Sequence, residues 1–221
     1  MKKILILFIL LAGCGGTQKA PVEQPKEAIV RNSTAELGTF RDTRDGKTYK
    51  TTKIGEQVWM AENLNYEVDG SVCYDSKPEN CQKYGSLYDW ETAKKVCPND
   101  WHLPSNAEWD KLYRFADGTS GTESPYISKT AGKHLKAKSG WDNYEGKLGN
   151  GMDTFGFAAL PGGGKDDDSF NTIGNSGFWW SSSIENLSSN AYSRVMTNGT
   201  EYAVWIKGGN SFLYSVRCVG D

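Results

Sequence analysis

The residues best suited to contact a ligand gather in one long polar stretch, from residue 138 to residue 175. Aromatic, carboxylate and amide side chains follow one another there, at Trp141, Asp142, Asn143 and Tyr144. An aromatic ring offers a sugar an apolar face, and amides and carboxylates hydrogen-bond to hydroxyls. Since so long a loop inside a domain is usually functional or locally packed, we predict that these four residues and Trp180 contact a ligand.

The same stretch also contains oxygen donors of the kind that calcium prefers. They are Asn150, Asp153, Asp166 and Asp168. The spacing of an EF-hand is absent, and a solvated turn is the simpler interpretation of residues 166–168. Calcium is therefore a weak hypothesis, and no other cofactor is expected.

Nothing in the sequence selects a catalytic centre. The two histidines, His102 and His134, have no serine or cysteine nucleophile beside them in a recognisable elbow. A glycosidase-type carboxylate pair is defined by its separation in space, which a sequence does not give. We expect His102 to pack structurally, His134 to be exposed, and the domain to be non-catalytic.

Four cysteines lie beyond residue 14: Cys73, Cys81, Cys97 and Cys218. An even number of cysteines in an exported chain indicates disulfides, and four allow three pairings. We favour Cys73–Cys81, which closes a short loop, and Cys97–Cys218, which joins mid-chain to the last strand. A zinc site is the alternative, but the usual C-x2-C spacing is missing.

The first residues predict export and a lipid anchor. Lys2-Lys3 and the apolar run 4–12 are typical of a signal peptide and too short to span a bilayer. The sequence Leu11-Ala12-Gly13-Cys14 resembles the bacterial lipobox, in which the cysteine is lipidated. An ordinary signal peptide with a stray cysteine is the alternative. Gly15, in place of an aspartate retention signal, favours the outer membrane and the cell surface.

We therefore divide the chain into a signal peptide (1–13), a polar linker (14–36) and one domain (37–221). The linker is free of aromatic residues, so it cannot offset its ordering entropy by burial. The 25 Lys and Arg residues nearly balance 27 Asp and Glu, which gives no case for nucleic acid as a partner. Eight Trp, eleven Tyr and 25 Gly predict an aromatic core wrapped in long turns. We assign Trp59, Trp101 and Trp109 to this core. Trp179 and Trp180 are adjacent in a predicted strand and point to opposite faces, so we expect one of them to be less buried.

Both strands and helices are expected among the elements that must position these residues. A strand meander is expected over 40–61, with turns at Asp45-Gly46 and Gly55-Glu56. A loop is expected over 63–85. Helices are expected over 88–96, over 106–116 behind a capping box at Ser105, and near 130–137. Later strands are expected at 178–183, 190–197, 200–207 and 211–219, with a tight hairpin at Asn198-Gly199. Two main helices lie between the strand groups without βαβ alternation, which predicts an α+β domain with antiparallel sheets.

The segment Trp90-x2-Ala93-x3-Cys97-x3-Trp101-His102-Leu103-Pro104 resembles the first-helix signature of the C-type lectin-like fold. In that fold a helix cysteine pairs with one in the final strand, which is a second reason for Cys97–Cys218. The resemblance implies calcium-dependent sugar binding in the long loop. However, both the Glu-Pro-Asn sugar signature and the Trp-Asn-Asp segment before the last strand are absent.

A second resemblance covers nearly the whole domain. Its motifs are Thr39-Phe40-Arg41-Asp42 with Asp45-Gly46-Lys47-x-Tyr49, the segments 55–64, 101–104 and 156–163, Phe178-Trp179-Trp180-Ser181-Ser182 and the segment 215–219. In this order they resemble the Fibrobacter succinogenes major paralogous domain. That family contains secreted or surface proteins, many of them lipoproteins, without an established biochemical activity. The resemblance implies surface location and a lectin-like fold, and it supplies no ligand.

Three functions follow from these observations. The leading hypothesis is a surface binding module for polysaccharide or another cell-surface ligand. The second is a structural envelope lipoprotein that binds other proteins. The third is an enzyme of the formylglycine-generating type, which shares the broad fold. Such enzymes need a reactive cysteine pair near the end of the domain, where Cys218 stands alone.

Overall fold

The computed structural model describes residues 35–119, 127–167, 169–185, 190–209 and 211–221. The predicted signal peptide, Cys14 and nearly all of the predicted linker lie outside these residues. The helices are η1 (Tyr74–Ser76), α1 (Pro78–Tyr84), α2 (Trp90–Val96), α3 (Asn106–Asp117) and α4 (Ala131–Leu135). The strands up to residue 128 are β1 (Glu36–Arg41), β2 (Thr48–Ile54), β3 (Gln57–Met60), β4 (Ser71–Val72), β5 (Leu87–Tyr88), β6 (Trp101–His102) and β7 (Ile127–Ser128). The later strands are β8 (Gly164–Lys165), β9 (Phe170–Asn171), β10 (Ser176–Ile184), β11 (Ala191–Thr197), β12 (Ala203–Gly208), β13 (Tyr214–Ser215) and β14 (Val219–Gly220).

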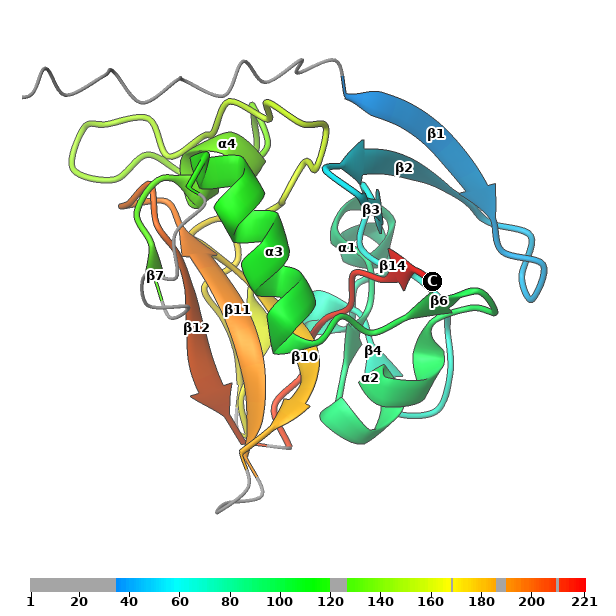
Figure 1. The fold of residues 1–221 in the computed structure, drawn as a ribbon. Coiled ribbons are helices and arrows are strands. Elements are labelled where there is room, and N and C mark those ends of the chain that lie inside the picture. Colours follow the sequence, from blue (N-terminus) through cyan, green and yellow to red (C-terminus); the bar gives the residue numbers. More distant parts are fainter. Residues whose placement is uncertain (1–34, 120–126, 168, 186–189, 210) are drawn as a thin grey trace, which may run out of the picture. The chain divides into compact units, whose positions relative to one another are not determined.

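Two main sheets organise the described part of the domain, and α3 crosses in front of β10 and β11 (Figure 1). One sheet has the order β1-β2-β3-β14-β6, and the other has the order β4-β5-β13-β10-β11-β12-β7. The terminal strand β14 pairs antiparallel with both β3 and β6. Pairing between the named strands is antiparallel apart from that of β10 with β13, and two isolated bridges, Lys136 with Ala159 and Gly163 with Gly177, are also parallel. The structure therefore confirms the α+β class with mainly antiparallel sheets.

The strand meander of the N-terminal half is confirmed. β1 and β2 pair in register from Glu36 opposite Lys53 to Arg41 opposite Thr48, and β2 continues into β3. The hairpin turn closes through a hydrogen bond from the Gly46 amide to the Asp42 carbonyl, 2.8 Å long. β1 is the edge strand of this sheet and is exposed along nearly its whole length, and we call β1 and β2 together the arm.

The second main helix, α3, begins where its capping signal predicts, whereas α2 begins at Trp90 and not at the predicted residue 88, because Tyr88 belongs to β5. In α2 the Asp89 carboxylate accepts a hydrogen bond from the Thr92 amide, 2.8 Å away. In α3 Ser105 and Glu108 form the predicted capping box, which satisfies otherwise unpaired amides. The loop prediction for 63–85 was wrong at α1, whose seven residues start with Pro78 in the first turn. A helix this short has no apolar period to detect.

Two corrections concern the last third of the chain. Ala203 of β12 pairs with Met196 of β11, so the connection is longer than the two-residue hairpin predicted at Asn198-Gly199. The predicted strand 211–219 is two short strands, β13 and β14, which belong to different sheets. The chain must pass from one sheet to the other between them, which breaks any continuous ladder.

The domain core lies on both faces of β10. Trp179 belongs to a cluster with residues of α3, α4 and the long loop, whereas Trp180 belongs to a cluster with residues of α2 and β5. Their side chains do point to opposite faces, as strand geometry requires. Both are 0 % exposed, so the expectation that one would be less buried was wrong. The reason is tertiary, because packing elements cover both faces of this central strand. Trp59 and Trp109 are buried as predicted, and Trp101 is partly buried.

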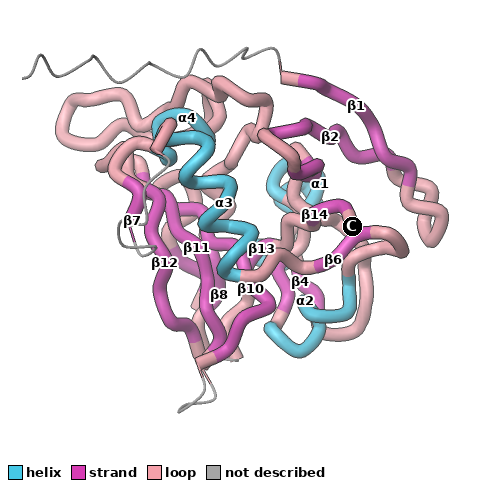
Figure 2. The backbone as a smooth tube through the Cα atoms, in the orientation of Figure 1, coloured by secondary structure: helices cyan, strands magenta, loops and turns pink. Residues whose placement is uncertain are grey.

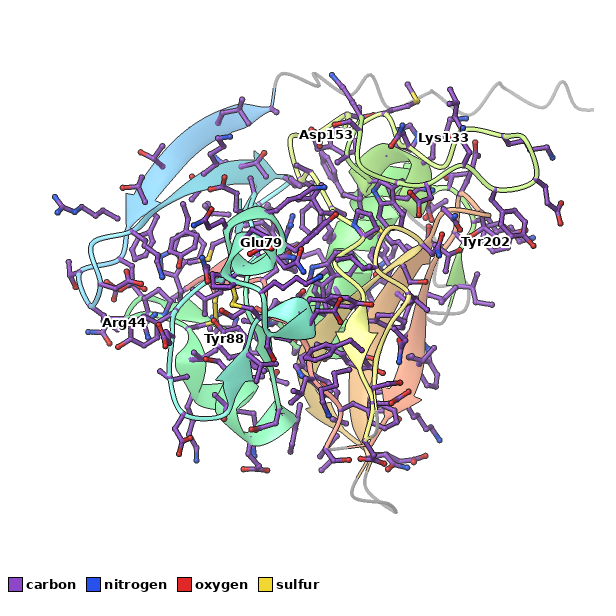
Figure 3. All side chains as sticks on the ribbon, turned by 180° about the vertical axis from the view of Figure 1, so that it is seen from behind. Arg44, Glu79, Tyr88, Lys133, Asp153 and Tyr202 are labelled. Atoms are coloured by element: carbon purple, nitrogen blue, oxygen red, sulfur yellow. A yellow bond between two sulfur atoms is a disulfide. The ribbon has the colours of Figure 1, made fainter. Side chains whose placement is uncertain are left out.

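Both predicted disulfides are present. Cys73 is bonded to Cys81 within the η1–α1 segment, and Cys97, at the end of α2, is bonded to Cys218 beside β14. Figure 3 shows a yellow sulfur–sulfur bond close to Tyr88. These pairings exclude the alternative of one zinc site built from four thiolates.

Candidate ligand-binding site

Two of the five predicted ligand-binding residues are core residues. Trp141 is 4 % exposed and its indole N–H donates to the Ala159 carbonyl, 2.9 Å away. Trp180 is 0 % exposed and its N–H donates to the Tyr88 carbonyl at 2.7 Å. Neither ring has a free face for a sugar, so their assignment as ligand contacts was wrong. Trp141 instead holds the long loop against the core cluster that contains Trp179.

The other three predicted residues are exposed and adjacent. Asp142, Asn143 and Tyr144 are solvent-exposed, and Tyr144 retains 49 % exposure. A tight turn holds the tyrosine, because Tyr144 and Lys147 exchange two backbone hydrogen bonds of 3.0 and 2.9 Å. One face of its ring packs on Gly199, where an added side-chain carbon would lie 3.1 Å from the ring. The tyrosine therefore has a fixed position and an accessible surface.

Lys136 is the residue that holds this loop in place, and the sequence analysis missed it. Its side chain is buried, and its ammonium donates to the carbonyls of Gly149, Thr197 and Thr200 at 2.8, 2.9 and 2.9 Å. Burial lowers the pKa of Lys136 to about 8, so the amine is mostly protonated at neutral pH. One cation thus ties the long loop to the β11–β12 turn.

Close backbone contacts explain the glycines of the loop. A side-chain carbon on Gly149 would lie 2.1 Å from the Asp142 carbonyl oxygen, and one on Gly151 would lie 2.4 Å from the Lys136 carbonyl oxygen. Contacts this short exclude any larger residue. The tube in Figure 2 shows that the segment beside α4 contains mostly loop, so these contacts replace a regular ladder.

We call the exposed surface formed by the loop and the β11–β12 turn the loop platform. It contains Asp142, Asn143, Tyr144, Asn198 and Tyr202. Asn198 is tied to Asn175 by a side-chain hydrogen bond of 2.9 Å and a backbone bond of 2.8 Å. Tyr202 is 44 % exposed and lies at the same end of the domain as Lys133, as Figure 3 shows.

The structure does not support the calcium candidates. Asn150 accepts from the Trp141 amide at 3.0 Å, and Asp153 accepts from the Ala158 amide at 2.7 Å. Asp166 caps a turn, accepting from the Ser169 amide at 2.9 Å, while Asp168 lies outside the described residues. No group of three or more His, Cys, Asp or Glu side chains that could hold a metal ion occurs in the described ranges. The carboxylates and amides of this loop organise its backbone instead.

Neither histidine is positioned as expected. His102, predicted to pack structurally, is 41 % exposed in its side chain and bridges two carboxylates, Glu108 at 2.6 Å and Asp221 at 2.5 Å. Burial would lower the pKa of His102, but the two acidic partners outweigh it and raise the pKa. His134, predicted to be exposed, is half-buried and hydrogen-bonds to Thr154 at 2.9 Å.

A groove separate from the loop platform is lined in part by the β1–β2 arm, and no sequence signal pointed to it. This arm groove has a volume of about 560 Å³. The β1–β2 hairpin lines it through residues 37–38 and 47–51, and three other segments complete it: 61–65, 81–85 and 153–160. Lys47, Lys50 and Lys83 supply positive charge there, and Glu62 and Asp153 supply negative charge.

A buried arginine stands behind the wall of the arm groove. Arg217 is 0 % exposed and its guanidinium donates to Asn63 Oδ1 at 2.8 Å and to the Phe157 carbonyl. Asn63 and Ala158, whose carbonyl also lies within reach of Arg217, both line the groove. Burial lowers the pKa of Arg217 to about 9, which leaves it charged at neutral pH.

Fold and surfaces together define a disulfide-bonded α+β domain with two exposed surfaces that could bind a ligand. Residues 52–220 match the Fibrobacter succinogenes major domain, so the chain belongs to that family, as its motifs predicted. No curated protein and no solved structure matches the chain. None of the helices in the described ranges is long and apolar enough to cross a membrane.

Proposed function

We propose that this protein is a lipid-anchored protein of the cell envelope whose domain binds polysaccharide at the loop platform and catalyses no reaction. The observation that carries the proposal is Tyr144, which is half-exposed, fixed by a turn and flanked by Asp142 and Asn143. An ordered aromatic ring among hydrogen-bonding groups can stack on a sugar at little entropic cost. The three hydrogen bonds of the Lys136 ammonium support the proposal because they hold the loop against the β11–β12 turn before a ligand binds.

We also propose the C-type lectin-like architecture. Three features support it: the helix-to-last-strand disulfide Cys97–Cys218, the pairing of β14 with β3, and the long loop between α4 and β10. Together they hold the ends of the domain side by side while a long excursion forms a surface. The hydrogen bonds that occupy Asn150 and Asp153 argue for sugar binding without calcium.

The anchor rests on the residues before the domain. The pattern Leu11-Ala12-Gly13-Cys14 supports lipidation, and two or more acyl chains hold a protein stably at a membrane. We place the domain on the outer membrane at the cell surface, joined to the lipid by the predicted linker. A polymer outside the cell would then be within its reach.

The test compares Tyr144→Ala with Tyr192→Ala in the full chain, using immobilised neutral and acidic plant polysaccharides. Loss of one stacking contact of about 1–1.5 kcal/mol should weaken binding about five- to tenfold. Tyr192 lies at the other end of β11, about 20 Å along the strand from the platform, so its variant should bind normally. Unchanged binding by Tyr144→Ala would remove the platform as the site.

A protein partner is the second candidate function, because the loop carrying Tyr144 also exposes Leu148 and Met152. They are 78 % and 50 % exposed, so both can contribute apolar contact area to a protein partner. The double variant Leu148→Ser/Met152→Ser separates the two functions. If it abolishes crosslinking to an envelope protein and leaves polysaccharide binding intact, the platform binds protein.

An enzyme of the formylglycine-generating type is the least favoured alternative. Its chemistry requires a reactive cysteine pair near the end of the domain, whereas Cys218 is bonded to Cys97. Each of the four cysteines in the described residues is in a disulfide, so none of them supplies a free thiol. These bonds favour a structural role for the cysteines.

A further inference from the structure

The arm groove is a second candidate site, built from different residues than the loop platform. We propose that it binds an acidic polysaccharide, a polymer whose sugar units carry carboxylates. The proposal rests on the proposed function for the class of polymer and adds the charge class and the place of binding. The charges, the neighbouring buried arginine and the polar lining carry the argument.

Two lysines offer the groove positive charge that the protein itself scarcely neutralises. Lys83, in α1, lies over the Tyr84 ring at 4.7 Å and forms no ion pair with a described residue. Lys50 is 3.8 Å from Glu62, and its side chain remains 76 % exposed. Such a loose surface pair contributes little, so Lys50 can turn to an incoming carboxylate at small cost.

Arg217 adds a charge that solvent does not screen. Its hydrogen-bonding partners, Asn63 and the carbonyls of Phe157 and Ala158, are all neutral. The two carboxylates that act on it, Asp153 and Glu62, line the groove and do not hydrogen-bond to it. A buried cation without a bonded anion is unfavourable. An anion placed in the groove would reduce this cost through the wall that Asn63 and Ala158 form.

The composition of the groove favours a polysaccharide over a denser polyanion. Three lysines and two carboxylates, Glu62 and Asp153, line the groove, and the buried Arg217 lies behind its wall. Those carboxylates would repel an unbroken row of charges such as an acidic peptide. They can instead accept hydrogen bonds from sugar hydroxyls, as can the amides of Asn65 and Gln82. A polysaccharide that carries both carboxylates and hydroxyls matches this mixture of cationic and hydrogen-bonding side chains.

The experiment measures binding of the full chain to polygalacturonate and to the same polymer after methyl esterification, which removes the charge and keeps the sugar. The acidic form should bind more tightly and should lose affinity as salt is raised. Lys50→Gln/Lys83→Gln should weaken its binding about five- to tenfold. The control pair is Lys111→Gln/Lys207→Gln, two lysines outside the groove that pair with Glu56 and Glu185, and it should bind normally.

Three results would overturn the inference. Equal binding of acidic and esterified polymer would show that charge plays no part. Unchanged binding by the Lys50/Lys83 variant would exclude the groove. Binding of poly-glutamate as tight as that of polygalacturonate would assign the groove to acidic peptides. Tyr144→Ala keeps the two proposals separate: if it alone weakens polysaccharide binding, the loop platform stands and the arm groove falls.

Discussion

The region around the Cys97–Cys218 disulfide and the region around Lys136 are ordered by different bonds. Around Cys97, a disulfide to Cys218 joins α2 to the end of the chain, and β14 pairs with β3 and β6. Around Lys136, the loop lacks a long regular ladder, and its carbonyls accept hydrogen bonds both from scattered backbone amides and from the Lys136 ammonium. Buried carbonyls must find donors, and at Gly149, Thr197 and Thr200 the buried lysine supplies them. A buried polar side chain can therefore join an irregular loop to a turn that no ladder connects to it.

The largest effect is expected when the disulfides are removed. The Cys97–Cys218 bond closes a loop of 121 residues in sequence separation, and Cys73–Cys81 closes one of 8. In the chain-entropy model, Cys97→Ser/Cys218→Ser should lower the free energy of unfolding by about 5 kcal/mol, and Cys73→Ser/Cys81→Ser by about 2.5 kcal/mol. Urea denaturation of both double variants measures the difference. Equal losses would contradict the entropic explanation.

The next largest effect is expected when the hydrogen bonds of the Lys136 ammonium are removed. Lys136→Met keeps the side-chain volume but leaves three carbonyls without their donor, at Gly149, Thr197 and Thr200. We expect a loss of about 2–4 kcal/mol in the free energy of unfolding. Amide hydrogen exchange should accelerate in residues 142–152 before it does in β3 and β14. Lys138→Met, at an exposed position two residues away, is the control and should change neither measurement.

The comparison also explains what the sequence could predict. The capping box at Ser105 and the hairpin at Gly46 are local signals, and both appear where predicted. The disulfides could be paired because the cysteine positions and the helix signature agreed. Trp180 was misassigned because strand alternation tells which face a residue takes, not whether another element covers that face.

The missed residues share a physical cause. A lysine is exposed by default, and nothing next to Lys136 in sequence indicates three carbonyls supplied by residues 149, 197 and 200. The arm groove is lined by four segments that are distant in sequence, so only the fold brings its lysines together. Asp142, Asn143 and Tyr144 could be predicted to share one surface because they are adjacent in the chain, and all three are exposed.

The smallest expected effect concerns a cation that is exposed, unlike Lys136. His102 bridges Glu108 at the start of α3 and Asp221 at the C-terminus, and these partners raise its pKa above the ordinary value. The folded protein therefore holds this proton more tightly than the unfolded chain. The extra stability is fully present below about pH 6 and is lost as the pH rises through the raised pKa.

His102→Gln should remove this pH dependence. The difference in unfolding free energy between the parent and His102→Gln should be greater at about pH 5.5 than at about pH 8.5, by less than about 1 kcal/mol, because the side chain is partly exposed. Asp221→Asn removes one of the two carboxylates and should give part of the effect while preserving the α3 capping box. A difference in unfolding free energy that grows toward high pH would contradict this prediction. It would mean that the folded protein favours the neutral form of His102, and that the residue stabilises the fold by packing and not by charge.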